Sequence, residues 1–312
     1  MKEQLIDFIF NNFPYRILLK LYPKYMKLRK GKVYKSVLDY VEKDNNPELK
    51  EIIPYMKKAG YLKFFYGDWT LKYEKSDYPI DLRRKDGLFY VRHKLFNGKI
   101  KKLYMPKGKG AGNCKLYYQS LLLDQDIESP HRYLFEENYN YIKKMGGTVL
   151  DLGAAEGNFS LEMGGIANSI ICFEPDENMR FALNNTMSPY KEKMKVVSKY
   201  VGEITDNENN TVSVDDYFGN NIPEDISVIK MDIEGFEQAA LRGMKRTLEK
   251  NPDAIILVCA YHQPQAESEI RDILESMGYN VKNRKGYMFF HEFDNFVEPY
   301  YRRGVLEARK HE

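Results

Sequence analysis

Short apolar runs alternate with amphipathic stretches from about residue 133 onward. The runs are rich in β-branched residues, and they are TVLDLG (148–153), SIICFEP (169–175), SVIKMDIEG (227–235) and DAIILVCAY (253–261). The last two are followed by stretches with helical periodicity, FEQAALRGMKRTLEK (236–250) and QAESEIRDILESMG (265–278). Near-continuous apolar strands separated by helices are typical of a parallel sheet covered on both faces. The pattern therefore predicts a doubly wound α/β domain, in which ligands bind at the carboxyl ends of the strands.

The first third of the chain has a mixed pattern. PELKEIIPYMKKAG (47–60) is typical of an amphipathic helix, and Pro54 inside it predicts a kink or an early stop. GLFYVRHKLFNGKIKKLYM (87–105) has an Asn-Gly pair between two apolar-rich runs, which is a strong hairpin signal. We interpret GKGAGN (108–113) as a linker, because it lacks the Lys-Ser/Thr ending of a phosphate-binding loop.

Composition favours an ordinary folded protein. The chain has 312 residues, 43% of them hydrophobic, which is enough for one large domain or two smaller ones. Cys114, Cys172 and Cys259 show no paired spacing, as expected in a reducing compartment. No apolar run reaches the length of a membrane span, and charged residues and Pro14 interrupt the apolar start of the chain. We therefore expect a soluble, cytoplasmic protein.

The net charge of +3 hides an asymmetry. Residues 1–120 carry 27 basic and 12 acidic side chains, and the remainder carries 21 and 33. The tracts KYMKLRKGKVYK (24–35) and KIKKLYMPKGKG (99–110) could contact an anionic membrane surface, an acidic or phosphate-bearing substrate, or nucleic acid. A solvated Lys-rich surface that docks on the acidic half is an equally simple interpretation.

The turn after the first apolar run has the features of a cofactor site. DLGAAEG (151–157) places Gly153 and Gly157 at turn positions, where the backbone can approach a ligand. Ala155 stands where a dinucleotide fingerprint needs its middle glycine. Asp151 would repel a pyrophosphate but could bind a cationic amino group.

The second run ends in Glu174, which is placed to accept hydrogen bonds from two ribose hydroxyls. A ligand with a ribose, an adenine and an amino-acid end fits this pair of features. The sequence therefore predicts S-adenosylmethionine as the cofactor.

Several stretches resemble the FkbM family of S-adenosylmethionine-dependent methyltransferases. They are VLDLGAAEGNFSLEM, ICFEPDENMRFALNN, TVSVDDYF, VIKMDIEGFEQAALRGM and ILVCAYH, and the Lys-x-Asp-x-Glu-Gly-x-Glu pattern at 230–237 is the most specific. YYQSLLLDQDIESPHRYLFEE (117–137) resembles a lead-in found in some members. One departure is Ala154-Ala155-Glu156, where the family often has Ala-Asn and a neutral residue.

The resemblance implies a class I, Rossmann-like fold with a mostly parallel seven-stranded sheet over residues 118–312. Residues 1–117 would form a smaller, basic, mixed α+β region that presents the acceptor. Members of this family are similar to sugar-hydroxyl O-methyltransferases, which implies a glycan or a nucleotide- or lipid-linked saccharide as the acceptor. The positive charge of residues 1–120 favours an acidic or phosphate-bearing one. Nucleic acid is not expected, whereas peripheral contact with a membrane is consistent with the basic tracts.

The resemblance also assigns cofactor residues. Those on the methionine and ribose side are Asp151, Gly153, Ala154, Gly157 and Glu174. Asp215 or Asp216 would lie near the adenine. Asp and Gly are also common turn and cap residues, so a structural role for each is the alternative.

The 230–237 pattern would form the reaction side. Strand alternation places Lys230, Asp232 and Glu234 on one face. A sugar hydroxyl is a poor acid, and we prefer His262, just past the fourth run, as its general base, with Asp232 and Lys230 as further catalytic residues. Alternatively, Asp232, Glu234 and His262 bind a divalent cation, for which Mg or Mn is suited.

The expected acceptor-binding residues are His131, Tyr261 and Glu237. Three other classes of protein stay open: a nicotinamide-dependent dehydrogenase, a nucleic-acid methyltransferase that uses the basic region, and a non-catalytic cofactor-binding subunit.

Overall fold

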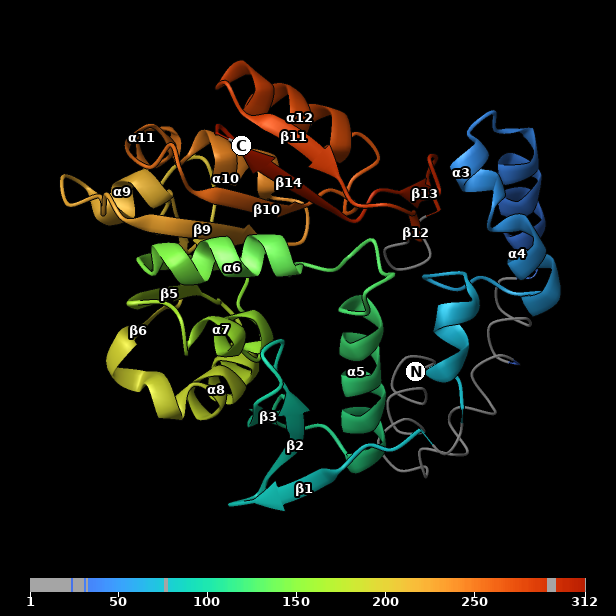
Figure 1. Cartoon of the computed structure of the whole chain (residues 1–312), viewed down its shortest axis with the longest axis horizontal. Helices are drawn as coiled ribbons and strands as arrows, with labels where there is room; N and C mark the ends of the chain where they lie inside the picture. The colour runs from blue at the N-terminus through green and yellow to red at the C-terminus, as the bar shows by residue number, and fades with distance from the viewer. Residues whose placement is uncertain (1–23, 25–30, 32, 76–77, 291–295, 312) are drawn as a thin grey trace.

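The computed structural model describes residues 24, 31, 33–75, 78–290 and 296–311, and its main body is a seven-stranded sheet. The strands, in their order across the sheet, are β11 (Asn280–Asn283), β14 (Val305–Arg309), β10 (Ile255–Cys259), β9 (Ile226–Met231), β4 (Thr148–Leu152), β5 (Ser169–Phe173) and β6 (Met194–Val197). β10, β9, β4, β5 and β6 pair in parallel, and β14 is antiparallel to both of its neighbours. The predicted doubly wound, mostly parallel sheet is confirmed (Figure 1).

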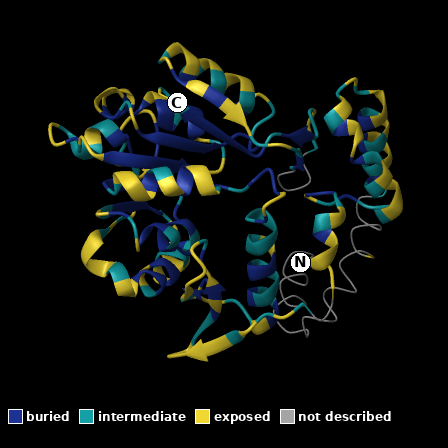
Figure 2. Ribbon diagram, in the orientation of Figure 1, coloured by how far each residue is buried: buried dark blue, intermediate teal, exposed yellow. Residues whose placement is uncertain are grey.

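Helices cover both faces of this sheet. One group consists of α6 (Glu136–Met145), α7 (Asn158–Met163) and α8 (Glu177–Thr186), and the other of α9 (Val214–Phe218), α10 (Glu237–Arg242), α11 (Lys245–Lys250) and α12 (Ala266–Ser276). Successive strand residues point into different cores: Val149 packs with the first group and Leu150 with the second. Figure 2 shows the resulting buried sheet between helices with exposed outer sides.

The N-terminal region has helices and a small antiparallel sheet. Its elements are α3 (Pro47–Lys50), α4 (Ile53–Ala59), β1 (Leu82–Lys85), β2 (Leu88–Lys94), β3 (Ile100–Tyr104) and α5 (Ala111–Asp124). The predicted hairpin is confirmed, since β2 pairs antiparallel with β3. The predicted break is also confirmed, because α3 and α4 are separate and Pro54 lies in the first turn of α4.

Shorter elements complete the fold. They are the 3₁₀ helices η1 (Asp68–Lys72) and η2 (Ser188–Lys193) and the strands β7 (Tyr200–Val201), β8 (Thr211–Val212), β12 (Met288–Phe289) and β13 (Tyr301–Arg302). Among the described residues, no helix has both the length and the apolar character of a membrane span. The basic tract 24–35 lies mostly outside the described residues.

Three local predictions were wrong. The 108–113 segment is not all linker, because α5 begins at Ala111. The single helix expected over 236–250 is two helices, since Gly243 meets another segment: a Cβ there would lie 2.2 Å from the carbonyl oxygen of Gly202. The third strand ends at Met231, so strand alternation does not extend to Glu234.

The expected boundary between residues 117 and 118 falls inside α5. Cys114 and Tyr118 of this helix belong to the same apolar core as α6, α7 and α8. The helix therefore joins the N-terminal region to the large sheet.

Candidate active site

The carboxyl ends of β4, β5 and β9 open onto one cavity of about 420 Å³. β4 and β9 are neighbours in the sheet, and the strand order reverses between them, where sheets of this kind bind ligands. The lining includes Gly153 after β4, Glu174 after β5, and Asp232 and Glu234 after β9. The sequence pattern therefore predicted correctly that these four residues lie at the carboxyl ends of the strands.

Glu174 is held rigidly at the cavity. One carboxylate oxygen accepts the N–H of Ala155 at 2.7 Å, and the other accepts that of Asp176 at 2.8 Å. Burial raises the pKa of Glu174, and these two hydrogen bonds act in the opposite direction. Since a carboxylate has about four acceptor positions, both oxygens can still accept hydrogen bonds from a ligand diol.

Backbone strain is concentrated around the same cavity. Gly153 has φ 78, and a Cβ there would lie 1.9 Å from the carbonyl oxygen of Asp232, so only glycine allows the two strand ends to approach. Ala155 (φ 46) and Glu234 (φ 57) are non-glycine residues in the left-handed region, and both line the cavity. Strained residues of this type cluster at functional sites.

A buried ion pair lies beneath the cavity. The Nζ atom of Lys230 is 3.2 Å from Oδ1 of Asp151, and it donates to the carbonyl oxygen of Gly153. The other oxygen of Asp151 accepts the hydroxyl of Ser160 at 2.6 Å. Burial lowers the pKa of Lys230, but Asp151 and Asp232 outweigh it and the pKa is raised. Lys230 therefore stays charged and cannot accept a proton in catalysis.

Asp232 is the centre of a polar cluster. Its oxygens accept the hydroxyl groups of Tyr133 at 2.6 Å and Tyr261 at 3.2 Å. The Nε2 atoms of two histidines also lie near Asp232. That of His262 is 3.5 Å from Oδ1 of Asp232, and that of His131 is 3.7 Å from Oδ2. Burial raises the pKa of Asp232, but the Lys230 cation and the histidines outweigh it, so the pKa is lowered and Asp232 is a carboxylate.

His262 is held between acidic groups. Its Nδ1 lies 2.9 Å from Oε1 of the fully buried Glu237, off the direction of a good hydrogen bond, so the contact is an ion pair when the ring is protonated. Glu237 is fixed by the N–H of Ile233 at 3.0 Å. Nε2 of His262 faces Asp232 and, at 3.5 Å, Glu234. Burial lowers the pKa of His262, but Glu237 and Asp232 outweigh this effect and raise it above 6.5.

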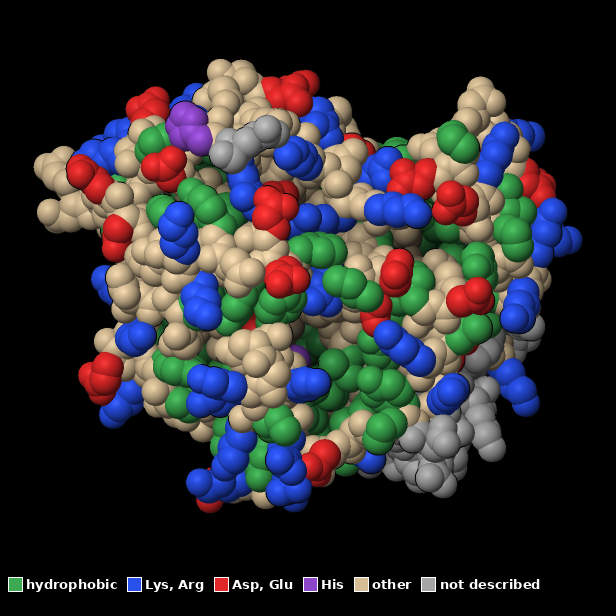
Figure 3. Space-filling view, in the orientation of Figure 1, with side chains coloured by type: hydrophobic (Ala, Val, Ile, Leu, Met, Phe, Trp, Pro, Cys, Tyr) green, Lys and Arg blue, Asp and Glu red, His purple; other side chains and the backbone are tan. Residues whose placement is uncertain are grey.

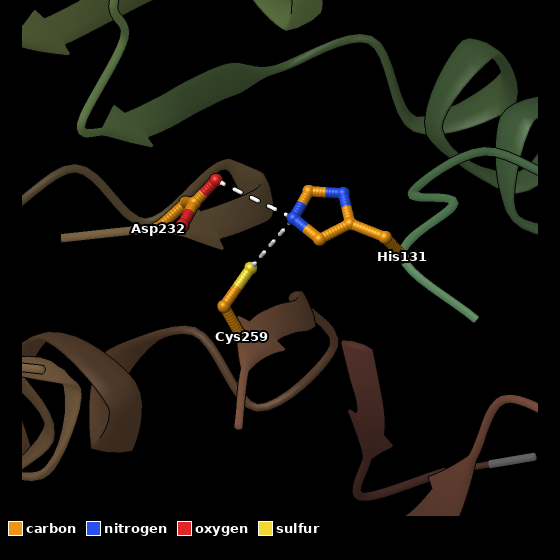
Figure 4. A group of neighbouring side chains, drawn as sticks. All are labelled: His131, Asp232 and Cys259. Carbon is orange, nitrogen blue, oxygen red and sulfur yellow. Dashed lines mark hydrogen bonds and ion pairs between the residues drawn. The ribbon is translucent and has the colours of Figure 1, made fainter. Parts of the chain in front are cut away.

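His131 approaches Asp232 from the loop before α6 (Figure 4). Its Nε2 lies 3.0 Å from the hydroxyl of Tyr261 and 3.8 Å from Sγ of Cys259. Burial lowers the pKa of His131 to about 4, so the ring is neutral near pH 7. Burial also raises the pKa of the Cys259 thiol, which stays protonated. His131 is therefore a neutral hydrogen-bonding group.

Two groups of side chains could hold a metal ion. Ligand atoms of His131, Asp232 and Cys259 lie within 4.8 Å of one another, as do those of Asp232, Glu237 and His262. The second group fits a hard divalent cation better, because the first depends on a protonated thiol. It contains the buried Glu237 in place of the predicted Glu234, whose side chain is 86% exposed.

Three predicted cofactor residues do not line the cavity. The carboxylate of Asp215 accepts the N–H groups of Arg246 and Thr247, both at 2.9 Å, and caps α11. Gly157 allows α8 to pack closely, since a Cβ there would lie 2.7 Å from Leu183. Ala154 is buried, and its N–H bonds the carbonyl oxygen of Phe173 at 3.1 Å.

Asp151 and Asp216 also lie apart from the cavity lining. Asp151 is fully buried in its pair with Lys230. Asp216 accepts the hydroxyl of Thr205 at 2.7 Å.

Sequence reasoning missed several residues near the site. Tyr133 hydrogen bonds to Asp232, and Tyr117 of α5 donates to the buried carboxylate of Glu156 in the loop after β4. In the sequence, Glu156 differs from the family pattern, and no role could be predicted for it. Burial raises the pKa of Glu156, and the hydroxyl of Tyr117 offsets part of the cost of burying this carboxyl group.

Known proteins similar to this chain are found among solved structures. No curated protein matches the chain. Solved structures similar to it include a Streptococcus mutans protein in complex with SAH, with 9% identity over 55% of this chain and 96% of that one and a TM-score of 0.37. An rRNA methylase from Streptococcus thermophilus has 12% identity over 59% of this chain and 98% of its own, with a TM-score of 0.37. A precorrin-6y C5,15-methyltransferase from Geobacter metallireducens has 12% identity over 56% of this chain and 88% of its own, with a TM-score of 0.36.

The sequence model described as the methyltransferase FkbM domain matches residues 121–281, more than half of the chain. This range contains the strand ends that form the cavity, together with Asp232, Glu237 and His262. The chain therefore belongs to the FkbM family of S-adenosylmethionine-dependent methyltransferases.

Proposed function

We propose that the protein transfers the methyl group of S-adenosylmethionine to a hydroxyl group of a sugar, in a glycan or in a nucleotide- or lipid-linked saccharide. The observation that supports this proposal is the position of His262, between Glu237 and Asp232, since Asp232 lines the strand-end cavity. A hydroxyl acceptor needs a base, and histidine is the side chain whose pKa lies nearest to neutral pH.

The cavity residues fit the cofactor. Glu174 would hold the ribose, and Gly153 with Ala155 would line the methionine side, since all three line the cavity and Glu174 is fixed by two backbone N–H groups. The bound cofactor supplies a methyl group on a sulfonium centre. The protein's own tasks are to align the acceptor and to remove its proton.

Proton removal is assigned to Nε2 of neutral His262. The imidazolium that forms is stabilised by Glu237 at Nδ1 and by Asp232 near Nε2. Glu237 thus acts through His262 as a positioning residue, although we had expected it to bind the acceptor. Lys230 keeps Asp232 ionised, and His131 and Tyr261 remain the proposed acceptor-binding residues.

A divalent cation at Asp232, Glu237 and His262 is the alternative way to acidify the hydroxyl. Glu237 Oε2 and His262 Nδ1 are buried atoms without a hydrogen-bond partner among the described residues, which is compatible with such a ligand set. Exhaustive treatment with EDTA separates the two mechanisms: unchanged activity removes the metal, and a loss restored by Mg or Mn supports it.

A nucleic-acid acceptor is the second candidate, since basic side chains are exposed on the N-terminal region. A cytoplasmic location stays a prediction.

The deciding experiment supplies methyl-labelled cofactor with saccharides or with RNA and compares wild type with His262→Ala. We expect label on saccharide oxygen and its loss in the variant. Label on RNA alone, or transfer indifferent to His262, would contradict the proposal.

A further inference from the structure

The small sheet β1–β3 has one face in the protein core and a second face whose charged side chains are exposed. Val91 and Leu103 are paired across β2 and β3 and are buried. Because side chains alternate along a strand, their immediate neighbours point to the other side. That outer side, which we call the basic face, carries Arg83, Lys85, Arg92, Lys94, Ile100 and Lys102, all exposed.

Like charges lie opposite each other on the basic face. Arg92 is paired directly with Lys102 across β2 and β3, an arrangement that lowers the stability of a sheet. Arg83 is paired with Asp81 at 2.9 Å, and Asp81 also attracts Arg92 at longer range, so this one carboxylate faces two of the cations. Figure 3 shows Lys and Arg side chains gathered at the lower edge of the molecule, over β1–β3.

We propose that the basic face of β1–β3 docks the protein on an anionic membrane surface. Basic side chains next to an anionic bilayer gain energy from its surface potential, which offsets their mutual repulsion. The face is a sheet surface with charges spread over three strands, which suits a layer of lipid headgroups better than one compact anion.

Apolar exposure on the same face favours lipid over nucleic acid. Ile100 is 52% exposed and lies opposite Lys94, where an aliphatic side chain can enter the headgroup region. The aromatic rings of this face are poorly placed to stack on bases: Tyr104 is buried, and the Nζ atom of Lys102 lies over the ring of Tyr90 at 5.0 Å. Docking would bring the protein to an acceptor that is carried on a lipid. Only this statement about the acceptor rests on the proposed function.

The test is sedimentation of the whole protein with vesicles of phosphatidylcholine, with or without phosphatidylglycerol, at low and high salt. We expect binding only to the anionic vesicles, and weaker binding as salt screens the charges. Arg92→Glu with Lys102→Glu should reduce binding at least about tenfold. Lys143→Glu with Lys144→Glu, on exposed positions of α6, makes the same change in net charge and should retain most of the binding.

Two single variants keep folding separate from docking. Lys102→Glu places a carboxylate opposite Arg92 across β2 and β3, so it should raise the melting temperature while it weakens vesicle binding. Ile100→Ser should weaken binding to vesicles and leave any binding to RNA unchanged. Equal binding to both kinds of vesicle, equal loss in the α6 control, or tighter binding to single-stranded RNA would overturn the proposal. Cofactor titration of the same variants shows whether the methyltransferase site is intact, whichever result is found.

Discussion

The Nδ1 atom of His262 lies 2.9 Å from Oε1 of Glu237, a carboxylate that is fully buried and fixed by the N–H of Ile233. This contact turns the other ring nitrogen toward Asp232. It also raises the pKa of His262 against the effect of burial. A base that must be neutral to act is thus held with a raised pKa, which has a direct consequence for the pH dependence of the reaction.

Glu237→Gln is predicted to move the ascending limb of the pH profile to lower pH. Loss of the carboxylate lowers the pKa of His262, so the ring is neutral at lower pH, and the maximal rate falls because the imidazolium is less stabilised. The profile of kcat/KM against pH measures both changes. Glu234→Gln, at an exposed carboxylate near the same ring, is the comparison and should shift the limb less. An unchanged limb in Glu237→Gln would mean that another group is the base.

Lys230→Met is predicted to lower the free energy of unfolding by about 3–5 kcal/mol, because it leaves the buried Asp151 without its cationic partner. Urea unfolding measures the loss. Adding Asp151→Asn should recover much of it, since asparagine can still accept the hydroxyl of Ser160. Equal instability of the single and double variants would show that the ion pair is not the cause.

Protonation of His131 is predicted to destabilise the fold in acid. Its pKa is about 4 in the folded protein and about 6.5 when unfolded, so the unfolded chain binds the proton more tightly. Stability is then lost as pH falls from about 6.5 to about 4, by up to about 3 kcal/mol. Urea unfolding of His131→Gln across this range should show a shallower loss than wild type. Parallel curves for the two proteins would count against a neutral, buried His131.

The strand pattern was enough to predict the sheet and one edge of the site. β4, β5, β9 and β10 lie in the apolar runs, and Glu174 was identified because a carboxylate directly follows such a run. Parallel strands place their carboxyl ends together, so local sequence information locates the cavity.

What the sequence pattern missed depends on contacts between distant segments. Tyr133 meets Asp232 across 99 positions, and Gly243 breaks its helix where it meets Gly202. Glu237 takes the place of the predicted Glu234 in the candidate metal-ligand group because β9 ends at Met231, after which strand alternation no longer orients side chains. Asp215 matched a family pattern, but hydrogen bonds to the start of α11 explain its position.

Calorimetric titration of S-adenosylmethionine is the most direct test of the central claim, that the cavity at the ends of β4, β5 and β9 is the cofactor site. Glu174→Ala should weaken binding by about 1–3 kcal/mol, the cost of removing one partner of a hydrogen bond to a charged group. Glu177→Ala, an exposed carboxylate in the first turn of α8, is the matched control and should bind as wild type does. Binding that is equal in wild type and Glu174→Ala would contradict the account.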